Sequence, residues 1–386
     1  MNILVTGAKG FVGKNLVVEL NNIKEGKAKY GSLSSELTIF EYDVDSDPVL
    51  FESYCEKADF VFNLAGVNRP KDPSEFMTGN FGFASTLLAT LKKYNNKATV
   101  MISSSTQVTL DNLYGKSKKA CENLFFQYGQ ETGAKVLVYR FPNLFGKWCR
   151  PNYNSVIATF CSNIASGLPI QVNDRSVVLT LTYIDDLIYE MIAALEGNEH
   201  RVGNYCEVPI TYSVSLGEIA DLIHSFKASR DERSIPDMSN EFVKKLYATY
   251  TSYLPTNEFS YPLESHCDNR GSFTEILRTR DRGQFSVNIS KPGITKGEHW
   301  HHTKNEKFLV VSGKGVIRFR KVDDTKVYEY FVSGDNLEVV DIPVGYTHNI
   351  ENLGDTDMIT FMWSCECFDP SRPDTFFLPV DKKREF

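Results

Sequence analysis

The pattern of hydrophobic and polar positions changes about two-thirds of the way along the chain. Before about residue 140, short runs of β-branched and aromatic residues alternate with segments of helical periodicity. Buried strands are predicted at 2–6, 37–42, 60–64, 99–103 and 136–140, with helices between them in segments such as 14–20 and 116–128. This alternation is typical of parallel strands joined by helical crossovers. We therefore expect an α/β fold with a doubly wound parallel sheet.

Further helices are predicted at 155–166 and around 216–227, where they would form a substrate-binding lobe. The pattern weakens near 238–260, so we place one domain at 1–245 and a second at 256–386. After the boundary the rhythm is of short strands separated by Gly, Pro, Asn and Asp, which predicts an all-β sandwich or barrel. The expected strands are 285–289, 307–311, 314–320, 328–332, 337–340 and 358–363.

Composition agrees with two domains and excludes some partners. A length of 386 residues exceeds one ordinary core, and 42% hydrophobic residues supply enough apolar mass for two. The net charge of −7 and the lack of a basic stripe argue against a nucleic-acid partner. We see no leader segment and no apolar stretch approaching the ~18 residues that span a membrane. The eight scattered cysteines then suggest reduced thiols in a cytoplasmic protein.

A glycine-rich segment follows the first predicted strand and opens a helix. In Gly7-Ala-Lys-Gly10-Phe-Val-Gly13 the glycines allow a tight turn and a close approach to a pyrophosphate, which would sit on N–H groups at the helix N-terminus. The strand before and the helix after make this spacing a dinucleotide site. The predicted cofactor-binding residues of this segment are Gly7, Lys9, Gly10, Phe11, Val12 and Gly13.

A possible proton donor follows further along. Tyr114 and Lys118 are four residues apart and share one helix face. A nearby ammonium favours the phenolate and moves the tyrosine pKa from ~10 toward working pH, so that Tyr114 can donate a proton to a carbonyl oxygen. The run Ser103-Ser104-Ser105 comes just before, and its hydroxyls could hold the same oxygen.

These motifs resemble the extended short-chain dehydrogenase/reductase family, which has a Rossmann fold. The glycine segment, Asn63-Leu-Ala-Gly66, the serine run, Tyr114 with Lys118, Arg140-Phe-Pro-Asn143 and Tyr183-Ile-Asp-Asp186 occur in family order over about residues 1–190. The resemblance implies that Ser105, with Ser104 as the alternative, joins Tyr114 and Lys118 in catalysis. It also implies that Ala65, Tyr114 and Lys118 contact the cofactor and that Asn143 contacts the substrate. The interval from serine to tyrosine is shorter than the family pattern.

The choice of cofactor and of phosphate contacts stays open at the level of sequence. Asp43 ends the second strand and favours the ribose diol of NADH, whereas Lys9 could pair with the 2′-phosphate of NADPH. We predict NADPH, with NADH as the alternative. Arg150 and Arg175 are predicted to contact a substrate diphosphate, although structural roles for both arginines fit nearly as well.

The second domain carries a separate cluster of histidines. His299 and His301 are two apart on a strand and share one face of a sheet, and Glu306 and His348 on neighbouring strands could complete a set of metal ligands. Three imidazoles and one carboxylate suit Zn, Fe, Mn, Ni or Co.

The segments around these residues resemble the two motifs of the cupin superfamily, a jelly-roll fold, over about residues 265–365, which implies that all four are metal ligands. Asp268-Asn-Arg270-Gly271-Ser-Phe273 also resembles cupin-type epimerases of 4-keto-6-deoxy nucleotide sugars. In those enzymes the histidine that matches His299 is a base and no metal is needed. Because His299 here falls at a ligand position, Tyr346 or Lys296 becomes the candidate base.

The order of the two parts resembles that of bifunctional capsular polysaccharide enzymes that make UDP-N-acetyl-6-deoxy-L-talosamine. This resemblance implies a cytoplasmic homodimer that binds a divalent metal, with Zn expected, and a UDP-sugar. Its cupin domain would epimerise C3 of a UDP-2-acetamido-2,6-dideoxy-4-hexulose before the Rossmann domain reduces C4. Two alternatives remain: a reductase whose cupin is only a structural or dimerisation module, and a redox-sensing module without turnover.

Overall fold

In the computed structural model of the protein, residues 1–31, 33, 36–70 and 72–381 are described. The chain divides into two compact units, 1–224 with 240–255 and 225–239 with 256–386. We call them the N-terminal domain and the β domain, and describe each separately. The chain therefore crosses between the domains three times. Residues 225–239 belong to the β domain, residues 240–255 belong again to the N-terminal domain, and the β domain continues from residue 256.

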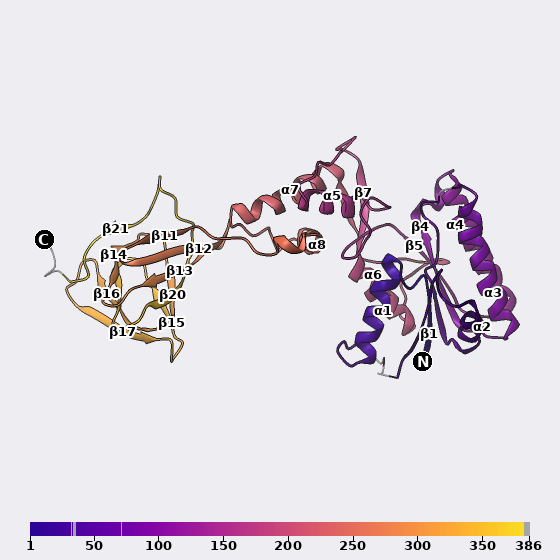
Figure 1. The fold of residues 1–386 in the computed structure, drawn as a ribbon, viewed down its shortest axis with the longest axis horizontal. Helices are drawn as coiled ribbons and strands as arrows, with labels where there is room; N and C mark the ends of the chain where they lie inside the picture. The colour runs from indigo at the N-terminus through magenta and orange to yellow at the C-terminus, as the bar shows by residue number, and fades with distance from the viewer. Residues whose placement is uncertain (32, 34–35, 71, 382–386) are drawn as a thin grey trace. The chain divides into compact units, whose positions relative to one another are not determined.

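The N-terminal domain is built on a seven-stranded sheet in the order β2-β1-β3-β4-β5-β9-β8 (Figure 1). The strands from β2 to β9 pair in parallel and only the short β8 is antiparallel, which confirms the predicted parallel sheet. The strands are β1 (Asn2–Thr6), β2 (Thr38–Tyr42), β3 (Phe60–Asn63), β4 (Thr99–Ser105), β5 (Val136–Phe141), β8 (Arg201–Val202) and β9 (Tyr205–Cys206).

Helices cover both faces of this sheet and bury two hydrophobic cores. One core packs α1 (Phe11–Lys24) and α6 (Ile184–Leu195) against the strands, and the other packs α2 (Pro48–Lys57), α3 (Phe83–Lys93) and α4 (Leu113–Thr132). Because the strands are covered on both sides, β1, β3 and β5 contain runs of at least three consecutive apolar residues rather than alternating apolar and polar ones. Nucleotides bind such sheets at the carboxyl ends of the strands.

The substrate-lobe region contains a small sheet and further helices. The sheet runs β10-β7-β6, from β6 (Asn143–Phe145), β7 (Val178–Tyr183) and β10 (Tyr212–Ser215). The helices are α5 (Val156–Ala165), α7 (Leu216–Asp231) and α8 (Glu241–Thr251). Helix α8 lies where the sequence pattern weakens, yet Asn240 caps it by accepting hydrogen bonds from Phe242 N and Val243 N.

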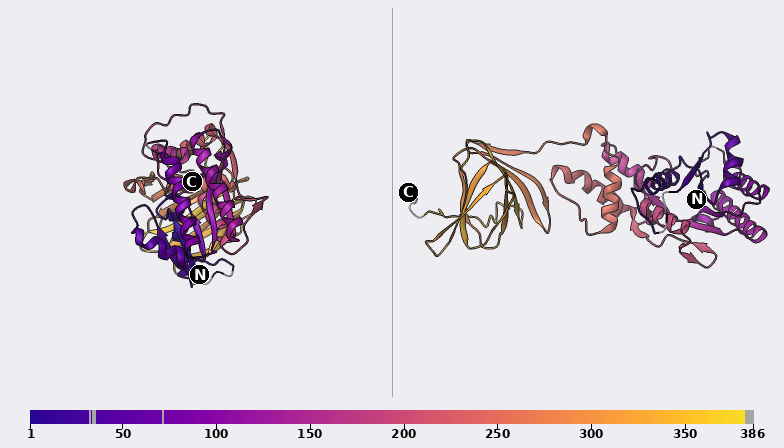
Figure 2. Two further views of the ribbon diagram at one scale, coloured as in Figure 1. Left: turned by 90° about the vertical axis from the view of Figure 1, so that its right-hand side faces the viewer. Right: turned by 90° about the horizontal axis from the view of Figure 1, so that it is seen from below.

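The β domain consists of two antiparallel sheets that share one core (Figures 1 and 2). The first sheet is β11-β12-β13-β20-β15-β18 and the second is β17-β16-β19-β14-β21. Their strands are β11 (Ser265–Asp268), β12 (Gly271–Thr279), β13 (Gly283–Ser290), β14 (Thr295–Trp300), β15 (Glu306–Ser312), β16 (Lys314–Lys321), β17 (Val327–Ser333), β18 (Val339–Ile342), β19 (Tyr346–Asn352), β20 (Met358–Ser364) and β21 (Phe376–Phe377). The all-β prediction is confirmed.

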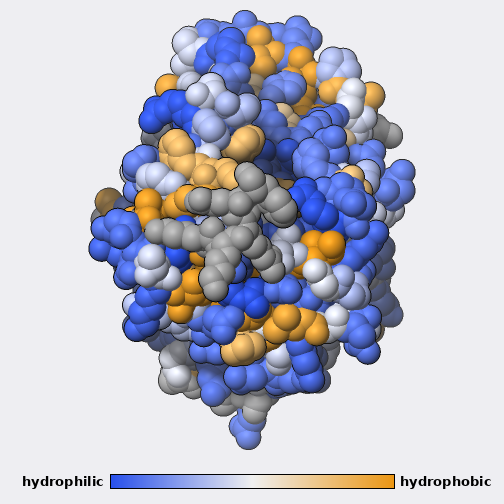
Figure 3. Space-filling model, turned by 90° about the vertical axis from the view of Figure 1, so that its left-hand side faces the viewer, coloured by the Kyte–Doolittle hydropathy of each residue, from blue (hydrophilic) through white to orange (hydrophobic). Residues whose placement is uncertain are grey.

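The surface of the protein mixes apolar and polar side chains. In Figure 3 hydrophobic residues lie in several groups separated by hydrophilic ones. Some of the largest exposed apolar side chains belong to the sheet edges, among them Phe331 on β17 and Phe377 on β21. Such edges are ready surfaces for association, and the expected homodimer stays a prediction. Within the described residues, no helix has the length and apolar character to cross a membrane.

Candidate active sites

The glycine loop has no room for side chains at two of its positions. Gly7 has φ +68°, and a Cβ there would lie 2.7 Å from the backbone nitrogen of Ala65. A Cβ at Gly13 would lie 2.1 Å from the carbonyl oxygen of Gly7. Helix α1 begins directly after Gly10, so its first N–H groups lack partners within the helix. The loop thus has the backbone geometry that a pyrophosphate needs.

The two groups that bear on cofactor choice lie beside each other. The ammonium of Lys9 pairs with Asp45 at 2.5 Å, and the Lys9 backbone N–H donates to Asp43 at 2.8 Å. The hydrogen bond to Asp45 raises the pKa of Lys9, so this side chain stays cationic. Asp43 also accepts from Val44 N at 2.7 Å. Its carboxylate is therefore already engaged by backbone donors at the end of β2.

The structure brings Ser105, Tyr114 and Lys118 together at the start of α4. Lys118 is buried and its Nζ lies 5.9 Å from the centre of the Tyr114 ring while donating to the carbonyl oxygen of Ser103 at 3.0 Å. Burial raises the pKa of Tyr114, and a hydrogen bond with Ser105 opposes that rise. Burial also lowers the pKa of Lys118. The lowered pKa expected for Tyr114 from sequence included the positive ring of a bound cofactor; among the protein's own groups, burial outweighs the hydrogen bond with Ser105 and the pKa is raised.

Ser104 has a different partner from Ser105. Its hydroxyl donates to Glu122 Oε1 at 2.8 Å, and Arg140 holds both oxygens of that carboxylate at 2.8 and 2.7 Å. Glu122 is fully buried, so these bonds neutralise a charge inside the domain. The geometry therefore favours Ser105 over Ser104 as the hydroxyl beside Tyr114.

Sequence reasoning did not find Asn80. This buried residue lies in a π-helical turn, Met77–Gly82, and its side chain accepts from Val67 N at 2.8 Å and donates to Ser117 Oγ at 3.1 Å. It thereby ties the loop after β3 to the helix that carries Tyr114. A π turn has no periodic pattern of hydrophobic residues. The only sequence signal at this position is therefore the asparagine itself.

The residues predicted to contact the substrate differ in whether an acidic side chain already pairs with them. Asn143 and Arg150 are exposed; Asn143 donates to Thr180 O at 3.2 Å, and the Arg150 guanidinium lies 5.4 Å from the Tyr153 ring. Arg175 instead pairs with Asp221 at 2.6 Å. That pairing supports the structural reading of Arg175.

In the β domain, the four predicted ligands converge. Their nitrogen and oxygen ligand atoms, from β14 and the residue after it, β15 and β19, all lie within 4.8 Å of one another. The carboxylate of Glu306 is 3.4 Å from His301 Nε2 and 3.5 Å from His348 Nε2. The His299 ring lies 4.6 Å from that of His348, its cross-strand neighbour. Residues 49 positions apart in sequence thus form one cluster.

The polar atoms of this cluster suit a cation. His301 Nε2, His348 Nε2 and Glu306 Oε2 are buried without a hydrogen-bond partner among the described residues, and such orphaned groups are rare unless an ion or water satisfies them. Burial lowers the pKa of His299 to about 4; burial also acts to lower the pKa of His301, but its contact with Glu306 raises it. Burial acts to raise the pKa of Glu306, but contacts with His301 and His348 lower it to about 2. Neutral imidazoles and an ionised carboxylate are the forms that bind metals.

Two backbone features aim the ligands. A bulge between Gly297 and His299 interrupts the pairing of β14 with β19, and Glu298 within it has φ +61°. On the other side, the carbonyl oxygen of Asp374 accepts from His301 Nδ1 at 2.5 Å, which leaves Nε2 facing the cluster. The Asp374 carboxylate accepts from three consecutive backbone N–H groups, at 302, 303 and 304, which lowers its pKa.

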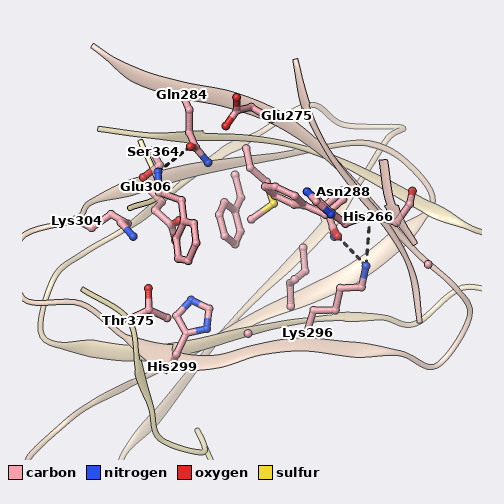
Figure 4. A pocket seen from close by; sticks show the side chains of 18 of the residues that line it. His266, Glu275, Gln284, Asn288, Lys296, His299, Lys304, Glu306, Ser364 and Thr375 are labelled. Carbon is pink, nitrogen blue, oxygen red and sulfur yellow. Dashed lines mark hydrogen bonds between the residues drawn. The ribbon is translucent and has the colours of Figure 1, made fainter. Parts of the chain in front are cut away.

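The cluster lies at one end of a cavity of about 940 Å³ (Figure 4). His299 and Lys296 both line it, and the Lys296 amine donates to Asn288 Oδ1 at 2.8 Å and to Ile289 O at 2.9 Å. Burial lowers the pKa of Lys296. Tyr346, the other candidate base, lines a different cavity with Phe319 and other residues, so that candidate is not supported.

Two family models match the chain. The NAD dependent epimerase/dehydratase family matches residues 3–206, and the polysaccharide biosynthesis C-terminal domain matches residues 266–376. Over almost its whole length the chain is also similar to the UDP-2-acetamido-2,6-beta-L-arabino-hexul-4-ose reductase of Pseudomonas aeruginosa. Identity is 40%, over 98% of this chain and 99% of the relative.

Solved structures give the same picture. A crystal structure of the capsular polysaccharide assembling protein CapF from Staphylococcus aureus has a TM-score of 0.90 and 55% identity, covering 98% of this chain and all of the other. The UDP-glucuronic acid 4-epimerase of Bacillus cereus, in complex with NAD, reaches a TM-score of 0.53 at 19% identity, over 66% of this chain and 96% of the other. This second likeness shows the N-terminal fold alone.

Proposed function

We propose that this chain, which belongs to the NAD dependent epimerase/dehydratase family, epimerises C3 of a UDP-2-acetamido-2,6-dideoxy-4-hexulose and then reduces its C4 ketone. The reductase half is supported by the arrangement of Ser105, Tyr114 and Lys118 and by the name of the relative with 40% identity. The names of the second domain family and of CapF support a place in capsular polysaccharide synthesis.

In the reduction, Tyr114 is the proton donor. The glycine loop would hold a nicotinamide cofactor, which would supply the hydride that C4 receives. The Tyr114 hydroxyl gives its proton to the ketone oxygen, which the Ser105 hydroxyl also binds. Because burial raises the pKa of Tyr114, the phenol is protonated near neutral pH and ready to donate.

In the epimerisation, the β domain removes and returns the C3 proton. That proton is acidic because the neighbouring C4 ketone takes up the charge as an enolate. The proposed metal ligands are His299, His301, Glu306 and His348, in a set for which Zn is the expected cation. A divalent metal held there would supply Lewis-acid stabilisation of the negative oxygen. The observation that carries this half is the group of orphaned buried nitrogen and oxygen atoms facing the cavity.

We propose Lys296 as the base that removes the C3 proton. The proton that inverts C3 reaches the opposite face of the enolate from solvent water in the cavity, and Lys296 releases its own proton to solvent. It lines the cavity that His299 lines, and burial lowers its pKa toward the neutral amine. The amine also lies 3.5 Å from Ser272 O. When it is neutral, it can keep the two shorter hydrogen bonds, to Asn288 and Ile289, and offer its lone pair to a proton. His299 is then free to act as a ligand. The cupin identity of the β domain is part of this proposal.

The two reactions must run in a fixed order. Reduction removes the C4 ketone and with it the acidity of the C3 proton. Epimerisation therefore comes first.

For the cofactor we propose NADPH. Lys9 is exposed at the glycine loop, where its ammonium can leave Asp45 for a 2′-phosphate. The backbone bonds that engage Asp43 reduce its availability to a ribose diol. In Lys9→Ala, we expect kcat/KM for NADPH to fall about ten-fold or more while that for NADH changes little. Equal losses for both cofactors would contradict the assignment.

Complementation tests the two-site function. A Tyr114→Phe variant should epimerise without reducing, and a His348→Ala variant should reduce without epimerising. Neither protein alone should form the doubly processed sugar, whereas a mixture should, since the intermediate can diffuse between chains. If His348→Ala alone yields the same product as the wild type, the β domain has no role in catalysis and the chain is a reductase only.

A further inference from the structure

The connector between the two domains contributes one arginine to the cavity of the β domain. Residues 225–239 group with the β domain, and within them Ser234 bridges to Arg278 on β12 in parallel fashion. Two backbone bonds hold this contact: Arg278 N donates to Arg233 O at 2.8 Å and Ile235 N donates to Arg278 O at 3.2 Å. Arg233 and Arg278 both line the cavity that contains the histidine cluster.

Two irregular backbone segments bring both arginines to Glu275. Arg233 has φ +56°, a left-handed conformation that is unusual for a side chain of this size. On β12 a bulge lies between Glu275 and Leu277. Residues three apart on a regular strand point to opposite faces, so the bulge is what allows Arg278 to reach Glu275. Strained backbone and bulges of this kind gather at ligand sites.

The result is a cluster with more positive than negative charge. Glu275 Oε1 accepts from Arg233 Nε at 3.1 Å and from Arg278 Nε at 2.7 Å, and a further Arg278 nitrogen lies 2.6 Å away. Glu275 is 9% exposed, whereas the side chains of the two arginines keep 25% and 37% exposure. One buried carboxylate therefore orients two guanidinium groups that still reach the cavity.

Several other charged residues line the cavity. Asp268 pairs with Arg270, and Glu306 belongs to the histidine cluster. Lys296 and Lys304 donate to neutral oxygens, while Glu264 and Glu366 also line the cavity. The arginine pair is thus the place where two planar cations share one acid, and such pairs suit phosphate oxygens.

We propose that Arg233 and Arg278 form a diphosphate subsite, which binds the anionic part of the nucleotide sugar while the reacting ring lies at the histidine cluster. This inference rests on the proposed function. The connector then completes the ligand site of the β domain, so the site depends on a segment that lies before the boundary expected from the sequence.

The test is Arg233→Gln in the full-length, metal-loaded protein. Glu275 keeps Arg278 as a partner in this variant, so no buried carboxylate is left unpaired. The readout is deuterium uptake at C3 of the 4-keto substrate in D₂O without nicotinamide. We expect KM to rise about ten-fold or more, since a charge-assisted bond is lost, with kcat nearly unchanged and partial recovery in Arg233→Lys. Arg282→Gln is the matched control, an exposed arginine that pairs with Asp281 outside the cavity lining.

Calorimetric titration with UDP separates this inference from the proposed function. Wild type should bind two UDP molecules per chain, one in each domain, and Arg233→Gln should bind one with the original affinity and the other at least ten-fold more weakly. If deuterium exchange fails in wild type but the titration behaves this way, the subsite stands without the epimerase. An unchanged KM, or titrations that are the same for both proteins, would overturn the subsite.

Discussion

At the scale of single residues, Tyr114 is the proposed proton donor of the reduction. Burial raises the pKa of the phenol, which keeps it protonated near neutral pH. In Tyr114→Phe we expect the reduction rate to fall by about 10²–10⁴-fold, with deuterium exchange at C3 retained. Absorbance at 340 nm follows the first and mass spectrometry the second. Loss of both activities would contradict separate sites.

Ser104 and Ser105 should respond differently to alanine. Ser105→Ala removes the hydroxyl next to Tyr114, so we expect kcat for reduction to fall about ten-fold or more. Because this hydroxyl also accepts from Gln107 N at 3.1 Å, a loss of about 0.5–2 kcal/mol in unfolding free energy should accompany it. Ser104→Ala removes a bond to buried Glu122 and should lower the free energy of unfolding by about 1–3 kcal/mol. Steady-state kinetics and denaturant unfolding separate the two effects. The reverse pattern would restore Ser104 as the catalytic alternative.

Asp374 is expected to control metal affinity without being a ligand. Its carboxylate fixes the loop whose carbonyl oxygen accepts from His301 Nδ1, and contacts that orient a metal ligand in this way are worth about 10–100-fold in affinity. Asp374→Ala should weaken Zn binding by that factor in competition with a chromophoric chelator. Asp369→Ala is the control, since Asp369 bonds only within its own turn. Equal Zn affinity in both variants would show that the loop does not organise the site.

At the scale of elements, the turn from β1 into α1 brings Gly13 so close to the backbone of Gly7 that no side chain fits at Gly13. Gly13→Ala would place a Cβ 2.1 Å from Gly7 O, so the helix must move away from the loop. We expect a loss of about 1–3 kcal/mol in unfolding free energy and weaker nicotinamide binding, measured by thermal unfolding and fluorescence titration. At Gly82 the nearest atom lies 3.9 Å away, so Gly82→Ala should change neither. Equal effects of the two variants would show that the close contact between Gly13 and Gly7 does not exclude a side chain.

The elements with strong periodicity could be predicted from the sequence. The first five strands of the N-terminal domain lie within a few residues of their predicted bounds. Four of them, β1, β3, β4 and β5, lie inside the sheet, where burial on both faces favours runs of apolar residues. Helix α8 was missed, since 238–260 mixes polar, aromatic and proline residues. The two-residue strands β8, β9 and β21 were also missed, because two residues are too few to show a periodic pattern.

The residues of the candidate sites also divide into those that a sequence pattern reveals and those that it does not. His299, His301, Glu306 and His348 could be found because strand alternation and turn glycines place them on one face. Asn80, Asp374 and Arg233 act through a π turn, a loop carbonyl and a left-handed residue. Such contacts depend on tertiary structure and leave no pattern in the sequence.

At the scale of the whole molecule, the two domains are expected to respond separately to metal removal. The proposed ligands all belong to the β domain, and the Ser105, Tyr114 and Lys118 group belongs to the N-terminal domain. Treatment with a chelator should abolish C3 exchange and lower the melting temperature of one transition. NADPH-dependent reduction of an already epimerised 4-keto sugar should continue. If chelation stops both reactions without unfolding, the sites are coupled more tightly than separate domains allow.

The central claim is that one chain holds two active sites for successive steps on one sugar. The most direct measurement is deuterium uptake at C3 when the protein is incubated with UDP-2-acetamido-2,6-dideoxy-4-hexulose in D₂O without any nicotinamide. The account predicts uptake that survives Tyr114→Phe and is lost in His299→Ala. Absence of uptake in the metal-loaded wild type, together with reduction once NADPH is added, would contradict it and leave a reductase attached to a structural β domain.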